Sequence, residues 1–454
     1  MMPVRAGLLL IASLAVTGIS QAQTSASPDE SLTIHGVTLY GIVDLGLQYD
    51  THAAPINDYF PAGSADIIQK NGNHSVTGAT PSNLSQSRVG LQGLEPLPGM
   101  GDWAAVFKLE TFFNPQSGDI SDGLKSLTQN NGRALTAQST NIDTSVAGQA
   151  FQQLYLGLAS PTFGSLTFGR QNTVLADGIA KYDPQGASQA FSVIGLSGTT
   201  AGGGDTQDRR LDSSLKYTLQ TNGVHFGVQY KFNQATGSAN SAVEAQLGGD
   251  YAGLSVDAYY VKVKDAVSAG ALSAAQVAML PTLGYSVSNS LTGTISDNTT
   301  YGLMGLYSVG GVKLFAGYEH IQYANPATPL AAGFNDIGNY TLAFVNNAAY
   351  DNDKVLQVYW AGVKYTVASL DLTAAYYGYK QNSYATGADA GCSTTVSGAC
   401  SGNLNGVSFS ADYRLTKRFD MYGGLMWTGV QNGLASGYLY KNNINPTIGG
   451  RFKF

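Results

Sequence analysis

The first question for this chain is whether its reactive side chains are arranged for catalysis. The sequence has no Gly-x-Ser-x-Gly, His-Glu-x-x-His or Gly-x-x-x-x-Gly-Lys motif. Its histidines are few and scattered, and His225 alternates with apolar residues, which favours an inward-facing side chain over a general base. The sequence therefore predicts no enzyme, no metal site and no cofactor. The five histidines are His35, His52, His74, His225 and His320.

The only two cysteines, Cys392 and Cys400, lie in one segment rich in Gly and Ser. An even number of cysteines in an exported chain favours a disulfide. A metal site would need further ligands nearby, and this segment has none. We therefore expect a disulfide between Cys392 and Cys400.

In several segments, polar and charged residues alternate with apolar residues along the chain. Such segments include "RRLDSSLKYTL", "VHFGVQYKFN", "GVSFSADYRLT" and "VTLYGIVDLGLQYD". A period of two predicts strands with one apolar and one polar face. In the first of these segments we expect Leu211, Ser213, Leu215, Tyr217 and Leu219 on the apolar face, and Arg210, Asp212, Ser214, Lys216 and Thr218 on the polar face.

Alternation also occurs in soluble β-sandwiches, but three further features favour a membrane barrel. Aromatic residues gather near strand ends, as in "YYVK", "YYGYK" and "YRLTKRF". The strands run about 10 residues, which matches a tilted membrane strand of ~9–11 residues. Short connections alternate with long ones near residues 51–84, 114–149, 172–208, 265–297, 324–352 and 382–402. Short turns at one end and long loops at the other are typical of outer-membrane barrels.

The strand-like segments number sixteen, an even number as antiparallel closure requires. The stretch "DAVSAGALSAAQVAMLPTLG" predicts a short loop helix that ends at Pro281. The last residues alternate up to Phe454, so the last strand should close the sheet against the first, with Phe452 and Phe454 on the lipid face. The expected strands start near Leu32, Arg88, Trp103, Phe151, Ser165, Arg210, Val224, Val243, Leu254, Tyr301, Val312, Lys354, Leu370, Asn405, Asp420 and Asn443.

The N-terminus resembles a secretory signal. Arg5 precedes the apolar run Gly7–Ile19, and small residues follow at Ser20 and Ala22. We expect residues 1–22 to be removed and residues 23–454 to form a single barrel domain. Removal of Arg5 leaves 23 basic and 30 acidic residues, a net charge of −7. An exported chain with this charge is a poor nucleic-acid binder.

Several of these segments resemble the trimeric general porins of Gram-negative bacteria, in particular the beta-proteobacterial type. The resemblance rests on "VTLYGIVDLGL", "NLSQSRVGLQGLEPLPGMGDWAAVFKLETFFN", "YLGLASPTFGSLTFGRQN", "RRLDSSLKYT" and the terminal Phe454. It implies an all-β fold, a transmembrane antiparallel 16-stranded β-barrel with an inward-folded constriction loop. It also implies a homotrimer in the outer-membrane lipid, and that Phe454 is a signal to the barrel assembly machinery.

The segment 172–207, after the fifth strand, is the candidate constriction loop. The resemblance places it inside the barrel; the alternative is a surface loop. The loop should present acidic side chains, and the wall opposite should present basic side chains with inward parity, which together would create a transverse field. The alternative is that each basic side chain is simply solvated in the lumen. The expected constriction residues are Asp177 and Asp183 on the loop and Arg88, Lys108, Arg210 and Lys216 on the wall, with Arg170 added because it resembles the arginine of the family's Gly-Arg-Gln step.

These features predict a passive, water-filled channel for small hydrophilic solutes and ions. Within the same class, the alternative is a substrate-selective channel, possibly with eighteen strands. Outside it, the alternative is an outer-membrane barrel enzyme such as a phospholipase or a protease. A long lumen loop and sixteen strands favour the channel.

Overall fold

The computed structural model describes residues 32–53, 74–113, 115–116, 151–194, 210–232, 241–271, 278–284, 291–327, 336–337, 340–341, 344–347, 350–390, 392, 399–435 and 441–454. The expected signal peptide, residues 1–22, lies outside these residues. None of the helices in the described residues is long and apolar enough to cross a membrane.

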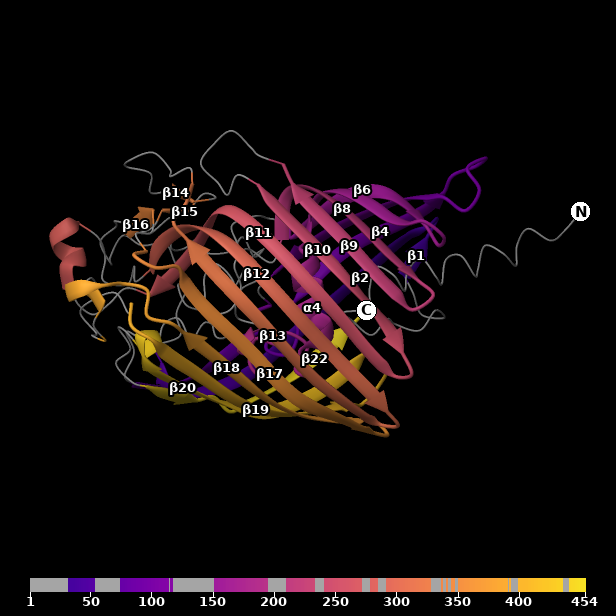
Figure 1. Ribbon diagram of the computed structural model, residues 1–454. Helices are drawn as coiled ribbons and strands as arrows, with labels where there is room; N and C mark the ends of the chain where they lie inside the picture. Colours follow the sequence, from indigo (N-terminus) through magenta and orange to yellow (C-terminus); the bar gives the residue numbers. More distant parts are fainter. Residues whose placement is uncertain are drawn as a thin grey trace, which may run out of the picture.

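The chain folds into one closed antiparallel β-barrel (Figure 1). Sixteen strands form the wall, which confirms the predicted fold class and strand number. Each strand pairs with its neighbour in sequence, as adjacent strands of alternating direction require. The wall strands are β2 (Val37–Ala53), β4 (Arg88–Pro96), β5 (Ala104–Phe112), β6 (Gln153–Ser160), β7 (Gly164–Asn172), β8 (Arg210–Thr221), β9 (Val224–Lys231), β10 (Ala242–Tyr251), β11 (Leu254–Ala271), β12 (Leu291–Val309), β13 (Val312–Ala324), β17 (Lys354–Val367), β18 (Leu370–Gln381), β19 (Gly402–Arg414), β20 (Phe419–Asn432) and β22 (Thr447–Lys453).

Four short strands complete or extend these positions. Like β4, β3 pairs with β2, so it extends the second strand of the wall. Like β22, β21 pairs with β20, so it extends the last strand. The strand β1 pairs with the start of β2. The fourth, β16, pairs in parallel with β12. A separate two-stranded ladder joins β14 (Asp336–Ile337) to β15 (Tyr340–Thr341). The bounds are β1 (Leu32–Ile34), β3 (His74–Pro81), β16 (Phe344–Asn347) and β21 (Asn442–Ile444).

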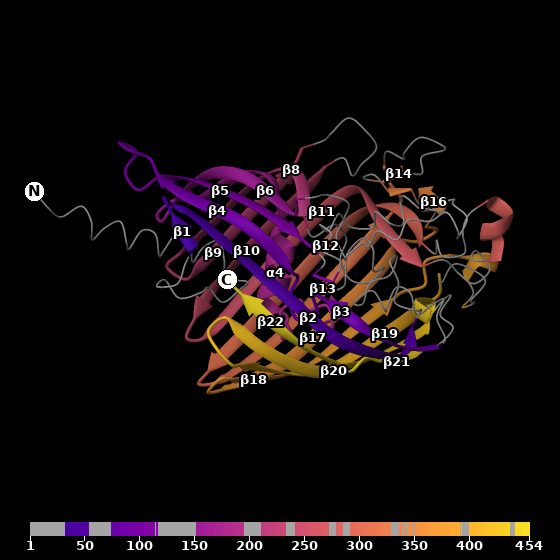
Figure 2. The same ribbon diagram turned by 180° about the vertical axis from the view of Figure 1, so that it is seen from behind.

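The barrel closes between its first and last long strands, β2 and β22, which lie side by side in Figure 2. The ladder runs from the pair Gln48 and Thr447 to the pair Ile42 and Lys453. Beyond it, Phe454 and Gly41 exchange two backbone hydrogen bonds of 2.9 and 3.1 Å. A side chain at Gly41 would collide with the Phe454 ring. We call this pairing of β2 with β22 the seam. Phe454 therefore ends the seam, as the alternation in the sequence predicted.

Three segments differ from the expectation. The first long connection was expected from residue 51, but β2 continues to Ala53 and β3 pairs back onto it. The first wall strand begins at Val37 rather than near Leu32, because His35 and Gly36 form a turn with positive φ. The expected loop helix was also placed too early. Residues up to Ala271 extend β11 through ladder bonds to β12, and the helical part is the 3₁₀ helix η5 (Leu280–Leu283).

The two faces of the wall are chemically opposite. Large apolar side chains such as Leu156, Leu303 and Ile448 are exposed on the outside. The inward positions carry polar side chains or support the helix α4 (Val174–Tyr182), which lies inside the barrel in both ribbon views. This arrangement is expected where lipid contacts the outer face and water fills the interior.

One strand pair departs from simple alternation. A register shift lies between Gly169 and Gln171 in the pairing of β7 with β8, and Gly169 has φ 138°, a conformation that disfavours a side chain. On β8, Ser213 has φ 47°. The expectation that Leu211 lies on the lipid face is therefore wrong, because this irregularity turns Leu211 inward, where it is buried in the core around α4.

The connection between β18 and β19 contains a disulfide between Cys392 and Cys400, with Cα atoms 5.3 Å apart. Gln381, at the end of β18, donates a hydrogen bond of 2.9 Å to the Cys400 carbonyl. The disulfide therefore closes a loop whose base is hydrogen-bonded to the wall.

The face assignment gives a first prediction. Leu303→Arg on β12 would place a charge against lipid and should lower the free energy of unfolding by ~2–4 kcal/mol if the site is near the midplane. Thr218→Arg, on the lumen face of β8, should cost much less because the guanidinium would reach water. Denaturant titration of the folded barrel in lipid vesicles measures both values. Similar losses in the two variants would contradict the assignment.

Candidate functional site

The segment after β7 folds into the lumen as α4. Thr173 caps the helix, because its side chain accepts a hydrogen bond of 3.0 Å from the Ala176 backbone. Two wall side chains, Gln229 and Glu244, accept hydrogen bonds from the backbone of Val174 and Leu175 at 3.1 Å each. The helix start is therefore fixed to the lumen side of β9 and β10 by polar contacts.

The buried face of α4 forms a hydrophobic core with the inner wall. Val174, Leu175, Ile179 and Tyr182 pack with wall residues that include Tyr259 and Val261 on β11, Trp360 on β17 and Tyr377 on β18. This core lies inside the barrel and holds the helix against one side of the lumen.

The end of α4 is tied to charged groups near the short turns. Lys181 donates to Asp257 at 3.2 Å, and Tyr182 donates a hydrogen bond to the same carboxylate. His225 lies between Asp257, at 3.1 Å, and Asp250, at 2.8 Å. His225 thus faces the lumen, as its parity predicted, and the contacts give it an anchoring position.

Asp183 was predicted to face the basic side chains, but it lies on the opposite side. It is buried, and it accepts a hydrogen bond of 2.6 Å from Tyr377. The Ala187 and Gln185 backbone N–H groups also donate to it, at 2.7 and 3.2 Å. Burial raises the pKa of Asp183, although these hydrogen bonds act to lower it. Asp183 therefore fixes the bend after α4 and does not contact the basic residues.

The loop continues across the lumen to the seam. Gln185 exchanges hydrogen bonds with Ser408 and Ser410 on β19, at 3.1 and 2.7 Å. Ser188 and Ala190 both donate to the Asn83 carbonyl. Asn83 belongs to residues 82–87, which connect β3 to β4. The loop is thus held to the wall at the start of α4, at Gln185 and at Ser188 and Ala190, and residues 195–207 of the expected constriction loop lie outside the described residues.

Opposite α4, the basic residues Arg88 and Lys108 share one carboxylate. Glu110 on β5 is almost fully buried and lies 3.9 Å from Arg88 and 3.6 Å from Lys108. Tyr40 and Gln153 donate hydrogen bonds to it at 2.9 and 3.0 Å. Glu110 was not among the expected constriction residues, although its position two residues after Lys108 gives it the same inward parity.

Arg210 joins this group through an aromatic ring. The guanidinium carbons of Arg210 and Arg88 lie 4.8 and 5.9 Å from the centroid of Phe112. Arg210 also interacts electrostatically with Glu110. Two arginines and Lys108 thus surround one buried carboxylate.

The remaining predicted residues form two ion pairs beside this group. Lys216 on β8 pairs with Asp177 of α4 at 2.5 Å, and Asp177 also accepts from Asn172 at 3.0 Å. Arg170, displaced by the irregularity in β7, pairs with Asp212 at 2.5 Å. Lys108 interacts electrostatically with Asp177 as well as Glu110, so the loop and wall charges belong to one electrostatic unit.

We call this unit the basic cluster: Arg88, Lys108, Arg170, Arg210 and Lys216 with the carboxylates Glu110, Asp177 and Asp212. Five basic side chains and three carboxylates leave a net charge of +2. Of the two predicted loop acids, only Asp177 contributes. A net positive lumen surface beside a water-filled path attracts anions, most strongly at low ionic strength.

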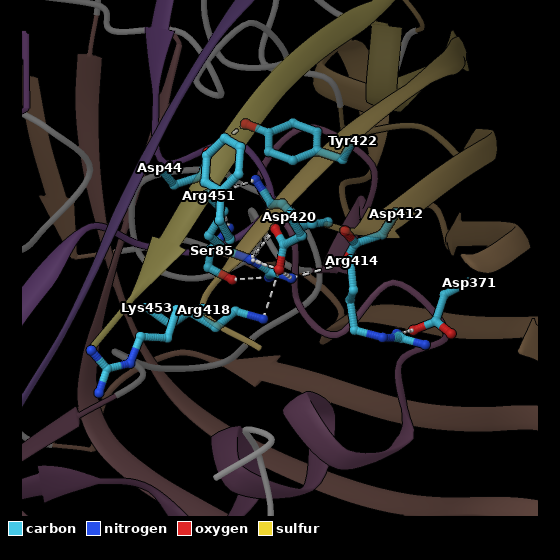
Figure 3. A network of polar contacts seen from close by, with 12 residues as sticks. Asp44, Ser85, Asp371, Asp412, Arg414, Arg418, Asp420, Tyr422, Arg451 and Lys453 are labelled. Atoms are coloured by element: carbon cyan, nitrogen blue, oxygen red, sulfur yellow. Dashed lines mark hydrogen bonds and ion pairs between the residues drawn. The ribbon is translucent and has the colours of Figure 1, made fainter. Parts of the chain in front are cut away.

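A second ionic network lies on the inner wall near the seam (Figure 3). Arg451 on β22 pairs with Asp412 at 2.8 Å and Asp420 at 2.9 Å, and it donates to Ser85 at 2.6 Å. Arg414 pairs separately with Asp371 at 2.7 Å. These contacts connect the last strands to residues 82–87 and thereby support the seam.

Comparison with known proteins gives three results. A family model described as Gram-negative porin matches residues 8–433. An outer membrane porin protein of Bordetella pertussis is 31% identical over 229 residues, which are 50% of this chain and 48% of that protein. The match thus spans about half the length of this curated relative.

Among solved structures, the "Anion-selective porin from Comamonas acidovorans" aligns with a TM-score of 0.58 at 18% identity, covering 92% of this chain and 99% of that chain. The trimer form of OmpT from Vibrio cholerae aligns with a TM-score of 0.55 at 15% identity, with 92% and 99% coverage. At these identities the alignments establish the shared fold.

The contacts of Asp183 give a second prediction. Tyr377→Phe removes the hydroxyl that donates to this buried carboxylate and should destabilise the docked loop by about 1–3 kcal/mol. We expect more frequent current fluctuations in single-channel recordings, because the bend after α4 would detach more often. Tyr376→Phe, on the outward face of the same strand, is the control. If both variants gave the same recordings as the parent, Asp183 would not anchor the loop.

Proposed function

The chain belongs to the Gram-negative porin family, and we propose from this membership and from its lumen charges that it forms a water-filled diffusion channel. The barrel lies in the outer membrane of a Gram-negative bacterium. Small hydrophilic solutes and ions would cross it passively, without a cofactor and without an enzymatic step. The segment after β7 would narrow the path, with the basic cluster at the constriction.

The observation that carries the proposal is the charge imbalance of the basic cluster. The precursor as a whole has a net charge of −6, which would favour cations if charge were spread evenly. A narrow lumen responds to nearby charge, because salt screens more distant charges beyond about 8–10 Å at physiological ionic strength. The local excess of basic side chains therefore supports a preference for small anions. The Comamonas structure, which is named for anion selectivity, has the same fold.

Three further proposals concern maturation and assembly. Residues 1–22 would direct export, and residues 23–454 would form the mature barrel domain. The outer face would pack against two further copies, since a trimer form is recorded for a structure of the same fold. The barrel assembly machinery would recognise Phe454 at the chain end.

Selectivity provides the main test. Arg88→Gln combined with Arg210→Gln should shift the zero-current potential toward cations, because two positive charges leave the constriction. Asp177→Asn should shift it toward anions. Both shifts should diminish at 1 M salt, where the Debye length falls to about 3 Å. Planar-bilayer recordings under a salt gradient measure both variants.

The matched control is Lys262→Gln combined with Lys264→Gln. These lysines are exposed on β11 and alternate with the buried Val261 and Val263, so they face away from the lumen. Their removal changes the total charge by the same amount and should leave the potential unchanged. An equal shift in this control would place the selective charges elsewhere.

The chain end provides a separate test of assembly. Deletion of Phe454 removes the last two backbone hydrogen bonds of the seam and the ring that covers Gly41. We expect normal synthesis but a strongly reduced amount of folded, heat-modifiable trimer in outer-membrane fractions. Phe452→Leu should have a smaller effect, because the seam hydrogen bonds remain. Undiminished trimer after the deletion would contradict the proposed role.

A further inference from the structure

A row of polar side chains crosses the inner wall away from the basic cluster. Lys313 on β13 lies directly opposite Lys364 on β17 in the antiparallel register. On either side, Ser308 on β12 is paired with Lys313, and Thr373 on β18 is paired with Lys364. We call these four residues the lysine row.

The lysine row faces the lumen. Leu314, Val363 and Tyr365, which flank the lysines in sequence, are exposed apolar side chains of the lipid face. Successive side chains of a strand point to opposite faces, so Lys313 and Lys364 point inward. Phe315, two residues after Lys313, is buried on the same inner face.

The two lysines form no ion pair within the described ranges, although acids lie near Lys364. Like charges directly opposite each other in a sheet are destabilising. The charged neighbours of Lys364 are Lys313 itself and the acids Asp371, Asp183 and Asp412. Each acid already has another donor: Arg414 for Asp371, Tyr377 for Asp183 and Arg451 for Asp412. Across the described ranges, neither lysine has an ion-pair partner within 4.0 Å.

The lysine row lies on the short-turn side of the loop. Lys313 follows the turn at Gly310 and Gly311, and Lys364 lies shortly before the end of β17. Gly362 is the inward-facing position that precedes Lys364 on β17. It lies so close to Pro184 of the loop that a side chain at this position would collide with Pro184. A solute that has passed the loop therefore meets the lysine row before it leaves the barrel.

We propose that the lysine row is an anion-binding subsite for small solutes that carry phosphate or carboxylate groups. The proposal rests on the proposed channel function and adds a second site on the solute path. Adjacent strands are about 4.8 Å apart, so two ammonium groups on neighbouring strands can converge on one oxyanion. Lysine binds such groups as a point charge, and the hydroxyl of Ser308 supplies a further donor.

Block of chloride current by inorganic pyrophosphate and by citrate tests the proposal. Each anion is added to either side of a planar bilayer that contains the native channel. We expect block from one side at lower concentration, since the row is near one mouth. Lys313→Gln combined with Lys364→Gln should raise the half-blocking concentration about tenfold or more, because two charge-assisted contacts are lost. Lys313→Arg combined with Lys364→Arg should retain the block.

Lys262→Gln combined with Lys264→Gln again removes two positive charges, here from the outer face, and should not change the block. An unchanged half-blocking concentration after Lys313→Gln and Lys364→Gln overturns the proposal, as does an equal change in this control. Calorimetric titration of pyrophosphate into the purified barrel separates the two levels of inference. If the barrel bound pyrophosphate through these lysines but carried no current, the subsite would stand and the channel function would be rejected. If it carried current without such binding, the channel function would stand and the subsite would be rejected.

Discussion

The structure depends on one constraint: backbone N–H and C=O groups within a bilayer must find partners inside the protein. A sheet meets this constraint only when its first and last strands pair, which β2 and β22 do. This pairing extends to Phe454, which exchanges two backbone hydrogen bonds with Gly41. The ionic contacts of Arg451 with Asp412 and Asp420 then link the last strand to its neighbours from the lumen side.

Closure inverts the usual arrangement of a folded protein, because the outer face must be apolar and the interior is polar. In this barrel, a hydrophobic core nevertheless forms inside the lumen, where the apolar face of α4 packs against the wall strands β11 to β18. This core determines which part of the wall remains open to solutes. The core lies against β11 to β18, whereas the basic cluster lies on β4 to β8 and on α4. Asp183, a candidate selectivity residue, instead anchors the loop beside this core.

The strands were predictable because their period of two is fixed by the requirement for two chemically different faces. Inward parity places Arg88, Lys108 and Lys216 on the lumen face, where they contact Glu110 and Asp177. Arg210 precedes the irregularity at Ser213, so it reaches this group through its contact with Phe112 and not by simple alternation. Their role at the constriction stays a prediction. The irregularity at Gly169 and Ser213 was not predictable, because a bulge changes parity without altering the local composition. The position of Asp183 depends on Tyr377, almost two hundred residues later, and no local pattern indicates that contact. Glu110, in contrast, follows from the parity of Lys108 and was available from the sequence.

The distribution of charge is also the basis of the proposed anion preference of this net negative chain. Most acids on the inner wall are occupied: Asp257 by Lys181 and His225, Asp420 by Arg451 and Lys453, and Asp371 by Arg414. Among the described residues, basic side chains outnumber carboxylates in the basic cluster, and the lysines of the lysine row form no ion pair. The lysine row lies on the short-turn side of the loop, and the basic cluster includes Asp177 of the loop itself, so in the proposed channel an anion would meet the two sites in succession. A single strongly positive site would hold the anion, whereas two moderate sites allow it to leave, because conduction requires binding that is both favourable and reversible.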